Sequence, residues 1–125
     1  MILDTNALSA LAAKDPNLIA TIRPAPRLCT TLISLGEYKY GLLGSRKRDE
    51  LERWLDAFLR KAETLYPNMA TLDDYAAIRR ELKLAGTPIP ANDCWIAALA
   101  RQHRMPVISR DSHFDHVRGA LRLDW

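Results

Sequence analysis

Five short apolar or β-branched segments alternate with helical patterns along the chain, and this alternation constrains the fold more than any other feature. The strand-like segments are MIL at 1–3, LCTTL at 28–32, TLY at 64–66, PVIS at 106–109 and LRL at 121–123. Strands this brief and apolar are typical of a parallel sheet that is covered on both faces. The sequence therefore predicts an α/β fold with a central parallel sheet of about five strands, flanked by helices on both faces.

The segments between the strands carry helical spacing. The pattern is clearest over residues 51–62, where apolar side chains recur at i, i+3, i+4 and i+7 and charged ones occupy the other side. Further helices are predicted over residues 6–13, 16–22 with Asp15 as cap, 35–43, from Thr71 with Asp74 to a stop at Gly86, and 91–103. The charged stretch RKRDE at 46–50 is interpreted as a solvated connection between two helices.

The length and composition of the chain predict one ordinary domain. No repeat, linker or low-complexity tract divides the 125 residues, so residues 1–125 are expected to fold together. Neither Cys29 nor Cys94 belongs to a recognisable metal-binding pattern, and both are interpreted as free thiols. No apolar run is long enough to span a bilayer. We therefore expect a soluble, cytoplasmic protein.

The charge distribution carries more information than the net charge. Lys and Arg number 18 and Asp and Glu number 15, a balance of +3 that is typical of an ordinary solvated surface. If four acids gather in one pocket, the rest of the molecule carries 18 basic residues against 11 acidic ones, or +7. A basic exterior around an acidic pocket is suited to a polyanion that is handled through metal ions.

Four acids are predicted to lie at one edge of the sheet. Asp4 ends the first strand, and Asp111 lies just past the strand at 106–109. Glu37 and Asp93 fall in the first turns of predicted helices, one after the second strand and one before the fourth. The carboxyl ends of parallel strands and the amino ends of the returning helices share one edge, where open α/β sheets bind their ligands.

Each acid alone also has a structural explanation. Asp4 could cap a helix, Ser34 with Glu37 fits a capping box, Asp93 could complement a helix dipole, and Asp111 could begin a turn. Packed together, however, carboxylates repel one another unless a cation compensates. Because all four ligands offer oxygen, a hard ion such as Mg²⁺ or Mn²⁺ is the natural choice, and such ions support phosphodiester hydrolysis.

Four blocks of the sequence resemble a known family. In the order MILDTNALSAL, ISLGEYKYGL, ANDCWIAALA and VISRDSHFDHVRG, they are similar to the PIN domain, and more narrowly to the VapC-type toxin ribonucleases of bacterial toxin–antitoxin pairs. The match spans nearly the whole chain. The resemblance implies a single PIN-like α/β domain and an endoribonuclease that depends on Mg²⁺ or Mn²⁺, in which metal-activated water attacks a backbone phosphorus and leaves a 3′-hydroxyl.

The resemblance also implies roles for the four acids. Asp4, Glu37 and Asp93 match the first three acids of the family, and are expected to bind the metal and to be catalytic. Asp111 matches the fourth acid. Asp115 is a nearby alternative for that role, and the sequence alone leaves the choice between them open.

Several polar residues lie close to these acids in the sequence. Thr5 and Asn6 are expected to orient Asp4 or its metal-bound water, although Asn6 is equally typical of an ordinary helix start. Asn92 is interpreted as structural. His113 and His116 are three residues apart and could pair as ligands, but no third soft partner is evident, so the alternative of a site without histidine is favoured.

The expected partners are RNA and protein. Seven basic residues are candidate contacts to RNA phosphates: Arg46, Lys47, Arg48, Arg79, Arg80, Arg110 and Arg118. The resemblance implies a homodimer and silencing by a cognate VapB-type antitoxin, whose flexible tail would fold along the groove and give a higher-order complex. No membrane partner is expected.

Other functions remain as alternatives. A housekeeping PIN nuclease would have no antitoxin, and a non-catalytic PIN-like module would bind RNA or protein after losing its metal, although all four acids are present here. A phosphatase of the haloacid-dehalogenase type would need a second Asp two residues after Asp4, where this chain has Asn6. A receiver domain would need an acidic pair near Asp4 and a late Lys, and the sequence shows neither arrangement.

Overall fold

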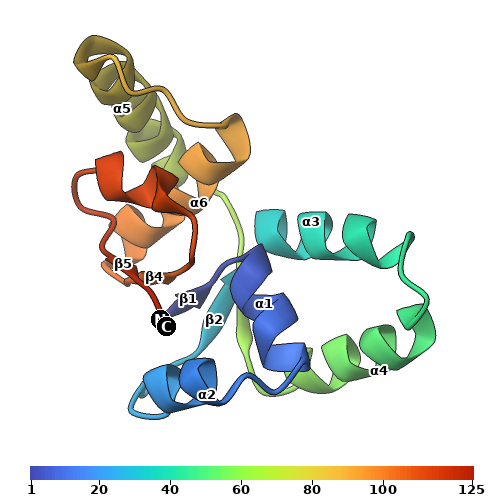
Figure 1. The fold of residues 1–125 in the computed structure, drawn as a ribbon. Coiled ribbons are helices and arrows are strands. Elements are labelled where there is room, and N and C mark those ends of the chain that lie inside the picture. The colour runs from blue at the N-terminus through green and yellow to red at the C-terminus, as the bar shows by residue number, and fades with distance from the viewer.

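A parallel sheet of five strands runs through the molecule in the order β3-β2-β1-β4-β5 (Figure 1). The structure is a computed structural model and describes all 125 residues. The strands are β1 (Ile2–Leu3), β2 (Cys29–Thr31), β3 (Glu63–Leu65), β4 (Val107–Ile108) and β5 (Arg122–Leu123). In the centre of the sheet, Ile2 lies opposite Cys29 on one side and Val107 on the other. All four strand pairs are parallel, so the predicted α/β fold is confirmed.

Helices connect the strands, and most of them lie where the sequence predicts. They are α1 (Thr5–Ala12), α2 (Pro16–Ile22), α3 (Leu32–Leu42), α4 (Arg48–Leu59), α5 (Met69–Ala85), α6 (Ala91–His103) and a short 3₁₀ helix, η1 (Ser112–His116). Asp15 caps α2, and Gly86 ends α5 in the left-handed region with a φ of 73°. None of the helices combines the length and apolar character that crossing a membrane requires.

Helix α3 begins three residues before the predicted start, and this changes the position of Glu37. Thr31 caps the helix, because its hydroxyl accepts the backbone N–H of Ser34 at 2.9 Å. The predicted capping box of Ser34 with Glu37 is therefore wrong. Glu37 lies in the second turn of α3 rather than in the first.

Two further helix starts differ from the prediction. Helix α4 begins at Arg48, so the second half of the supposed solvated connection forms its first turn, where Asp49 and Glu50 favourably face the helix dipole. Helix α5 begins with a capping box between Asn68 and Thr71, so the expected start at Thr71 is two residues late. Both corrections concern polar residues, which are equally typical of a loop and of the first turn of a helix.

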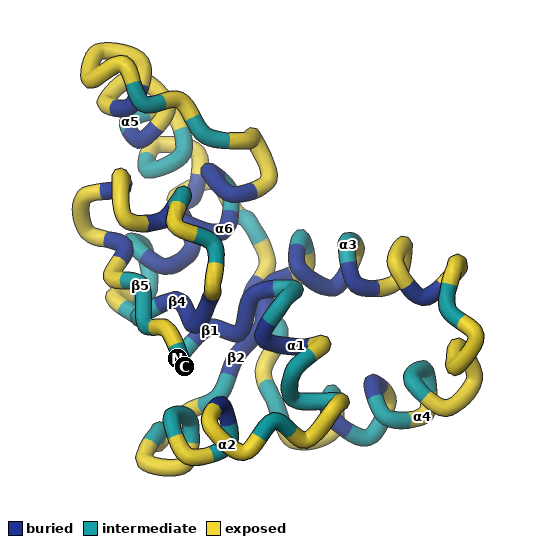
Figure 2. Tube along the Cα trace, viewed as in Figure 1, coloured by how far each residue is buried: buried dark blue, intermediate teal, exposed yellow.

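The sheet separates two hydrophobic cores. Successive side chains of a strand point to opposite faces, so Ile2 and Val107 pack among residues of α5 and α6, whereas Leu3 and Ile108 pack among residues of α1, α3 and α4. The helices accordingly lie on both sides of the strands (Figure 1), and the burial is deepest along the central strands and α6 (Figure 2). The carboxyl ends of β1 and β4 are thus held between two packed layers.

Candidate metal centre

Asp4 follows β1 directly and is almost completely buried. Its exposed fraction is 4%. It takes the N-cap position of α1, but its side chain bonds no backbone N–H of that helix, so helix capping does not explain it. One carboxylate oxygen, Oδ1, is buried without a hydrogen-bond partner. Because a buried oxygen without a partner costs free energy, this atom indicates a ligand site rather than a structural contact.

Ser109 connects Asp4 with the segment that carries Asp111. Its buried hydroxyl donates to Oδ2 of Asp4 at 2.9 Å and accepts the amide of Asn6 at 3.1 Å and the backbone N–H of Asp111 at 3.0 Å. Oδ1 of Asn6 in turn accepts the backbone N–H of Arg110 at 3.2 Å. Ser109 is not among the site residues that the sequence predicts, although a small polar residue at the end of an apolar strand is a usable signal.

Glu37 is fixed by hydrogen bonds to both of its carboxylate oxygens. The hydroxyl of Thr5 donates to Oε2 at 2.6 Å, and the amide of Asn92 donates to Oε1 at 2.8 Å. Glu37 is thereby tied to the amino ends of α1 and α6. The sequence predicts that Thr5 orients Asp4 or its metal-bound water and that Asn92 is structural, whereas in the structure both residues donate hydrogen bonds to Glu37.

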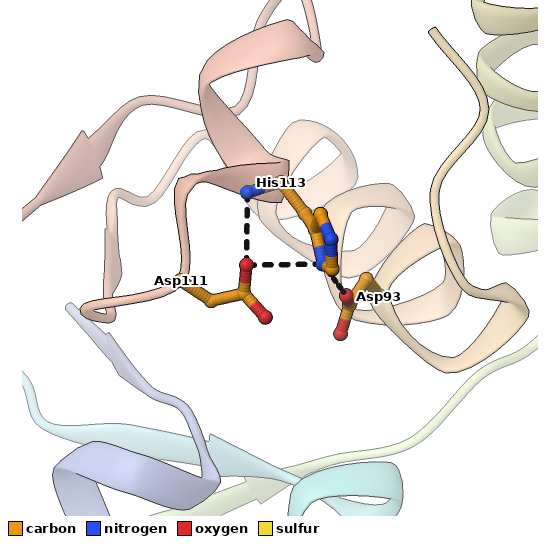
Figure 3. Close-up of side chains that lie close together, drawn as sticks. All are labelled: Asp93, Asp111 and His113. Atoms are coloured by element: carbon orange, nitrogen blue, oxygen red, sulfur yellow. Dashed lines mark hydrogen bonds and ion pairs between the residues drawn. The ribbon is translucent and has the colours of Figure 1, made fainter.

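Asp93, Asp111 and His113 converge beside the amino end of α6 (Figure 3). Nδ1 of His113 lies 2.8 Å from Oδ2 of Asp93 and 3.0 Å from Oδ1 of Asp111, and the backbone N–H of His113 donates to that same Asp111 oxygen at 2.9 Å. One ligand atom from each residue lies within 4.8 Å of the others, a separation that a shared cation could bridge. The alternative pairing of His113 with His116 is not formed, because the partners of His113 are acids and His116 is exposed.

Asp115 does not join the other acids. Its carboxylate accepts two hydrogen bonds from Arg122, at 2.7 and 3.0 Å, and this guanidinium holds the pKa of Asp115 below its ordinary value. Asp111 instead lies beside Asp93. Of the two alternatives for the fourth acid, the geometry favours Asp111.

Burial and neighbouring negative charges raise the pKa of two acids at this edge, Asp4 and Asp93. Burial is the largest cause of the raised pKa of Asp4, and the charges of Asp93 and Glu37 add to it. Burial likewise raises the pKa of Asp93, with further contributions from Asp111 and Glu37. The hydrogen bond with Asp93 raises the pKa of His113. Mutual repulsion of this kind is what a bound cation relieves.

The basic residues expected to contact RNA lie in several places. Arg110 turns away from Asp111 toward the end of the chain, where its guanidinium lies 4.4 Å from the ring centre of Trp125. Arg79 and Arg80 on α5 line a hollow of about 350 Å³ next to the first turn of α6. The other candidates lie before or at the start of α4 and after η1: Arg46, Lys47, Arg48 and Arg118.

The residues at this edge fit a hard divalent cation. Carboxylate oxygens are the ligands that Mg²⁺ and Mn²⁺ prefer, and Asp4, Asp93 and Asp111 supply them from three separate segments of the chain. The Asp4 oxygen without a hydrogen-bond partner and the close approach of Asp93 to Asp111 both suit a bound cation. The chemistry of the donors therefore agrees with the sequence expectation.

The sequence of this chain is similar to a family model and to several known proteins. The sequence model of the PIN domain matches residues 1–120. Ribonuclease VapC1 of Haemophilus influenzae is 29% identical over 128 aligned residues, which cover 98% of this chain and 96% of that protein. Ribonuclease VapC5 of Mycobacterium tuberculosis is 31% identical over 100 residues, covering 78% of this chain and 74% of that protein.

Solved structures are similar over almost the whole chain. VapBC-1 from nontypeable Haemophilus influenzae superposes with a TM-score of 0.85 at 28% identity, covering 99% of this chain and 96% of the other. FitAcB from Neisseria gonorrhoeae superposes with a TM-score of 0.87 at 26% identity, covering 98% and 96%. Both likenesses therefore concern the fold of almost the whole chain.

Proposed function

This chain belongs to the PIN domain family, and on that premise we propose that it is a metal-dependent endoribonuclease that acts as the toxin of a toxin–antitoxin pair. One observation carries the proposal: four acids from four separate segments of the chain lie close together at the carboxyl edge of the sheet. They are Asp4, Glu37, Asp93 and Asp111. Relatives named Ribonuclease VapC align over nearly the whole chain, which supports RNA as the substrate.

The four acids are the residues that would hold Mg²⁺ or Mn²⁺. When bound, such an ion acidifies a water molecule and neutralises charge on a phosphodiester during in-line attack. The residues around the acids keep the carboxylates in place. Ser109 fixes Asp4, while Thr5 and Asn92 fix Glu37.

The RNA-binding surface is proposed to include basic residues near this edge. Arg79 and Arg80 are the best-placed candidates, because the hollow that they line is also lined by Cys94, the neighbour of Asp93. Phosphate contacts of this kind position an RNA strand without reading its sequence. Arg110 is less suited to the role, because its guanidinium is engaged by Trp125 and lies 3.5 Å from Asp15.

The proposed protein partner is a VapB-type antitoxin, and the proposed assembly is a homodimer that binds it. A hollow of about 410 Å³ between α1, α3 and α4 is our candidate docking site. The hydroxyl of Tyr38, which lines this hollow, is buried without a hydrogen-bond partner. Solved relatives that are VapBC complexes support this partner. We expect a gene for a small DNA-binding protein beside the gene for this chain.

Metal removal is the direct test of the proposed function. Purified protein is expected to cut RNA with Mg²⁺ or Mn²⁺ and to lose that activity in EDTA, because the acids alone supply no activated nucleophile. The measurement is the cleavage of an end-labelled RNA on a denaturing gel, with re-addition of excess metal as the control. Equal cleavage in EDTA would contradict the proposal.

Ser109→Ala is expected to weaken metal binding by about 10- to 100-fold, since outer residues that orient ligands have effects of this size. The substitution removes the hydroxyl that holds Asp4 and the backbone of Asp111. The measurement is a calorimetric titration with Mn²⁺. Ser112→Ala, at an exposed position on η1, is the matched control and should bind like the unmodified protein. Unchanged affinity in Ser109→Ala would show that Asp4 is positioned by other contacts.

A further inference from the structure

An imidazole nitrogen lies among the oxygen ligands of the candidate metal centre. Nδ1 of His113 faces two carboxylates from different segments of the chain, at 2.8 Å from Asp93 and 3.0 Å from Asp111. A ring nitrogen offers one proton or one lone pair. When no ion is bound, a proton on Nδ1 supplies the positive charge between the two carboxylates and is shared with them. A metal ion that both carboxylates bind would take the place of this proton, which leaves to solvent, and would meet the lone pair of the nitrogen.

The separations are those of ligands on one ion. Octahedral Mg²⁺ or Mn²⁺ binds its ligands at about 2.1 Å, so neighbouring ligand atoms lie about 3 Å apart. The two distances from Nδ1 to the carboxylate oxygens agree with this spacing. An independent observation at the same edge is the buried Oδ1 of Asp4, which has no hydrogen-bond partner.

The local backbone holds the imidazole in this place. Oδ1 of Asp111 accepts the backbone N–H of His113 at 2.9 Å, which closes a tight turn at the start of η1. The next residue, Phe114, is fully buried in the core beside α6. The side chain of His113 itself is 43% exposed, so an ion can reach it from solvent. The ring is therefore held by its backbone and remains accessible.

We propose that His113 is a nitrogen ligand of the metal ion that Asp93 and Asp111 bind, and that it makes the centre prefer Mn²⁺ over Mg²⁺. The inference rests on the proposed metal-dependent function and adds a ligand to it. Carboxylates suit both ions, whereas a nitrogen ligand binds Mn²⁺ more readily than it binds the harder Mg²⁺. A centre with one nitrogen ligand is therefore expected to have a higher ratio of Mn²⁺ affinity to Mg²⁺ affinity than a centre built only from oxygen ligands.

The test is the electron spin echo envelope modulation of Mn²⁺ bound to the protein, which detects a directly coordinated ¹⁴N. The modulation of a bound imidazole is expected in the unmodified protein and in His116→Ala, the matched control on the same 3₁₀ helix, and it should be absent in His113→Ala. The ratio of Mn²⁺ to Mg²⁺ affinity, measured by calorimetry, should fall at least about tenfold in His113→Ala and stay unchanged in His116→Ala.

The spectrum of the unmodified protein shows whether bound Mn²⁺ has a nitrogen ligand even if His113→Ala folds poorly. In that case His113→Gln replaces His113→Ala as the variant without the imidazole. Bound Mn²⁺ without ¹⁴N modulation would overturn the role of His113 while leaving the proposed ribonuclease intact. Modulation that persists in His113→Ala would likewise overturn it and assign the nitrogen to His103 or His116, the other two histidines. Failure to bind Mn²⁺ at all would refute the proposed metal-dependent function together with this inference.

Discussion

Asp4→Asn and Asp93→Asn are each expected to reduce metal-dependent RNA cleavage by about 1000-fold or more, because several kcal/mol of transition-state stabilisation depend on the ion. Each substitution removes a negative charge from the acid cluster while keeping the size of the side chain. The measurement is the initial rate of cleavage of a labelled RNA at saturating Mn²⁺. Metal-independent cleavage that persists in both variants would refute the mechanism.

Asp115→Asn is the matched control for these two variants. It removes the same charge from the same type of side chain, but Asp115 is paired with Arg122 away from the other acids. We expect its cleavage rate to stay close to that of the unmodified protein. A large loss of activity in Asp115→Asn would instead indicate that Asp115 is the fourth acid.

The stability of metal-free Asp4→Asn shows whether this variant loses activity through a lost metal ligand or through a destabilised fold. The pKa of Asp4 is raised by burial, so the folded state binds this proton more tightly than the unfolded state does. Ionisation of Asp4 therefore costs stability as the pH rises above its unfolded pKa of about 3.9. Asn stays neutral, so metal-free Asp4→Asn should be more stable than the unmodified protein at pH 7, and this difference should vanish below about pH 4. Lower stability at pH 7 would attribute the lost activity to misfolding.

The strand pattern made most of the fold predictable. Segments such as PVIS at 106–109 are short, apolar and bounded by helix ends. Four of the five predicted segments contain a strand of the sheet, and the segment at 64–66 overlaps β3, which begins one residue earlier. Once the sheet was known to be parallel, the topology placed Asp4, Asp93 and Asp111 at one edge. The amino end of α3 was harder to predict, because Thr31, Ser34 and the residues between them suit either a strand end or a helix cap.

The contacts inside the site could not be predicted in the same way, because they join residues that are far apart in the chain. Ser109 bonds Asp4 across 105 positions, and Asn92 bonds Glu37 across 55. Periodicity reports which face of an element is buried, but it does not report which side chain of another element will meet it. The choice between Asp111 and Asp115 depended in the same way on Arg122 of β5, which pairs with Asp115 and not with Asp111.

The 3₁₀ helix η1, which Asp111 caps, depends on one apolar side chain. Phe114 is the fully buried residue of η1, and it packs in the same core cluster as Ile96 and Leu99 of α6. It lies between His113, which faces Asp93, and Asp115, which faces Arg122. Packing of this ring therefore determines where the polar residues on both sides of it lie.

Phe114→Ala is consequently expected to lower the free energy of unfolding by about 3–5 kcal/mol, through lost burial and the cavity that remains. Urea denaturation followed by circular dichroism measures this change. Leu121→Ala is the control: Leu121 is 64% exposed, and its substitution should stay within about 0.5 kcal/mol. Under conditions where Phe114→Ala remains folded, its affinity for Mn²⁺ should also fall, because Asp111 and His113 lose their fixed backbone. Unchanged metal affinity alongside the expected loss of stability would show that these two residues are positioned by their hydrogen bonds alone.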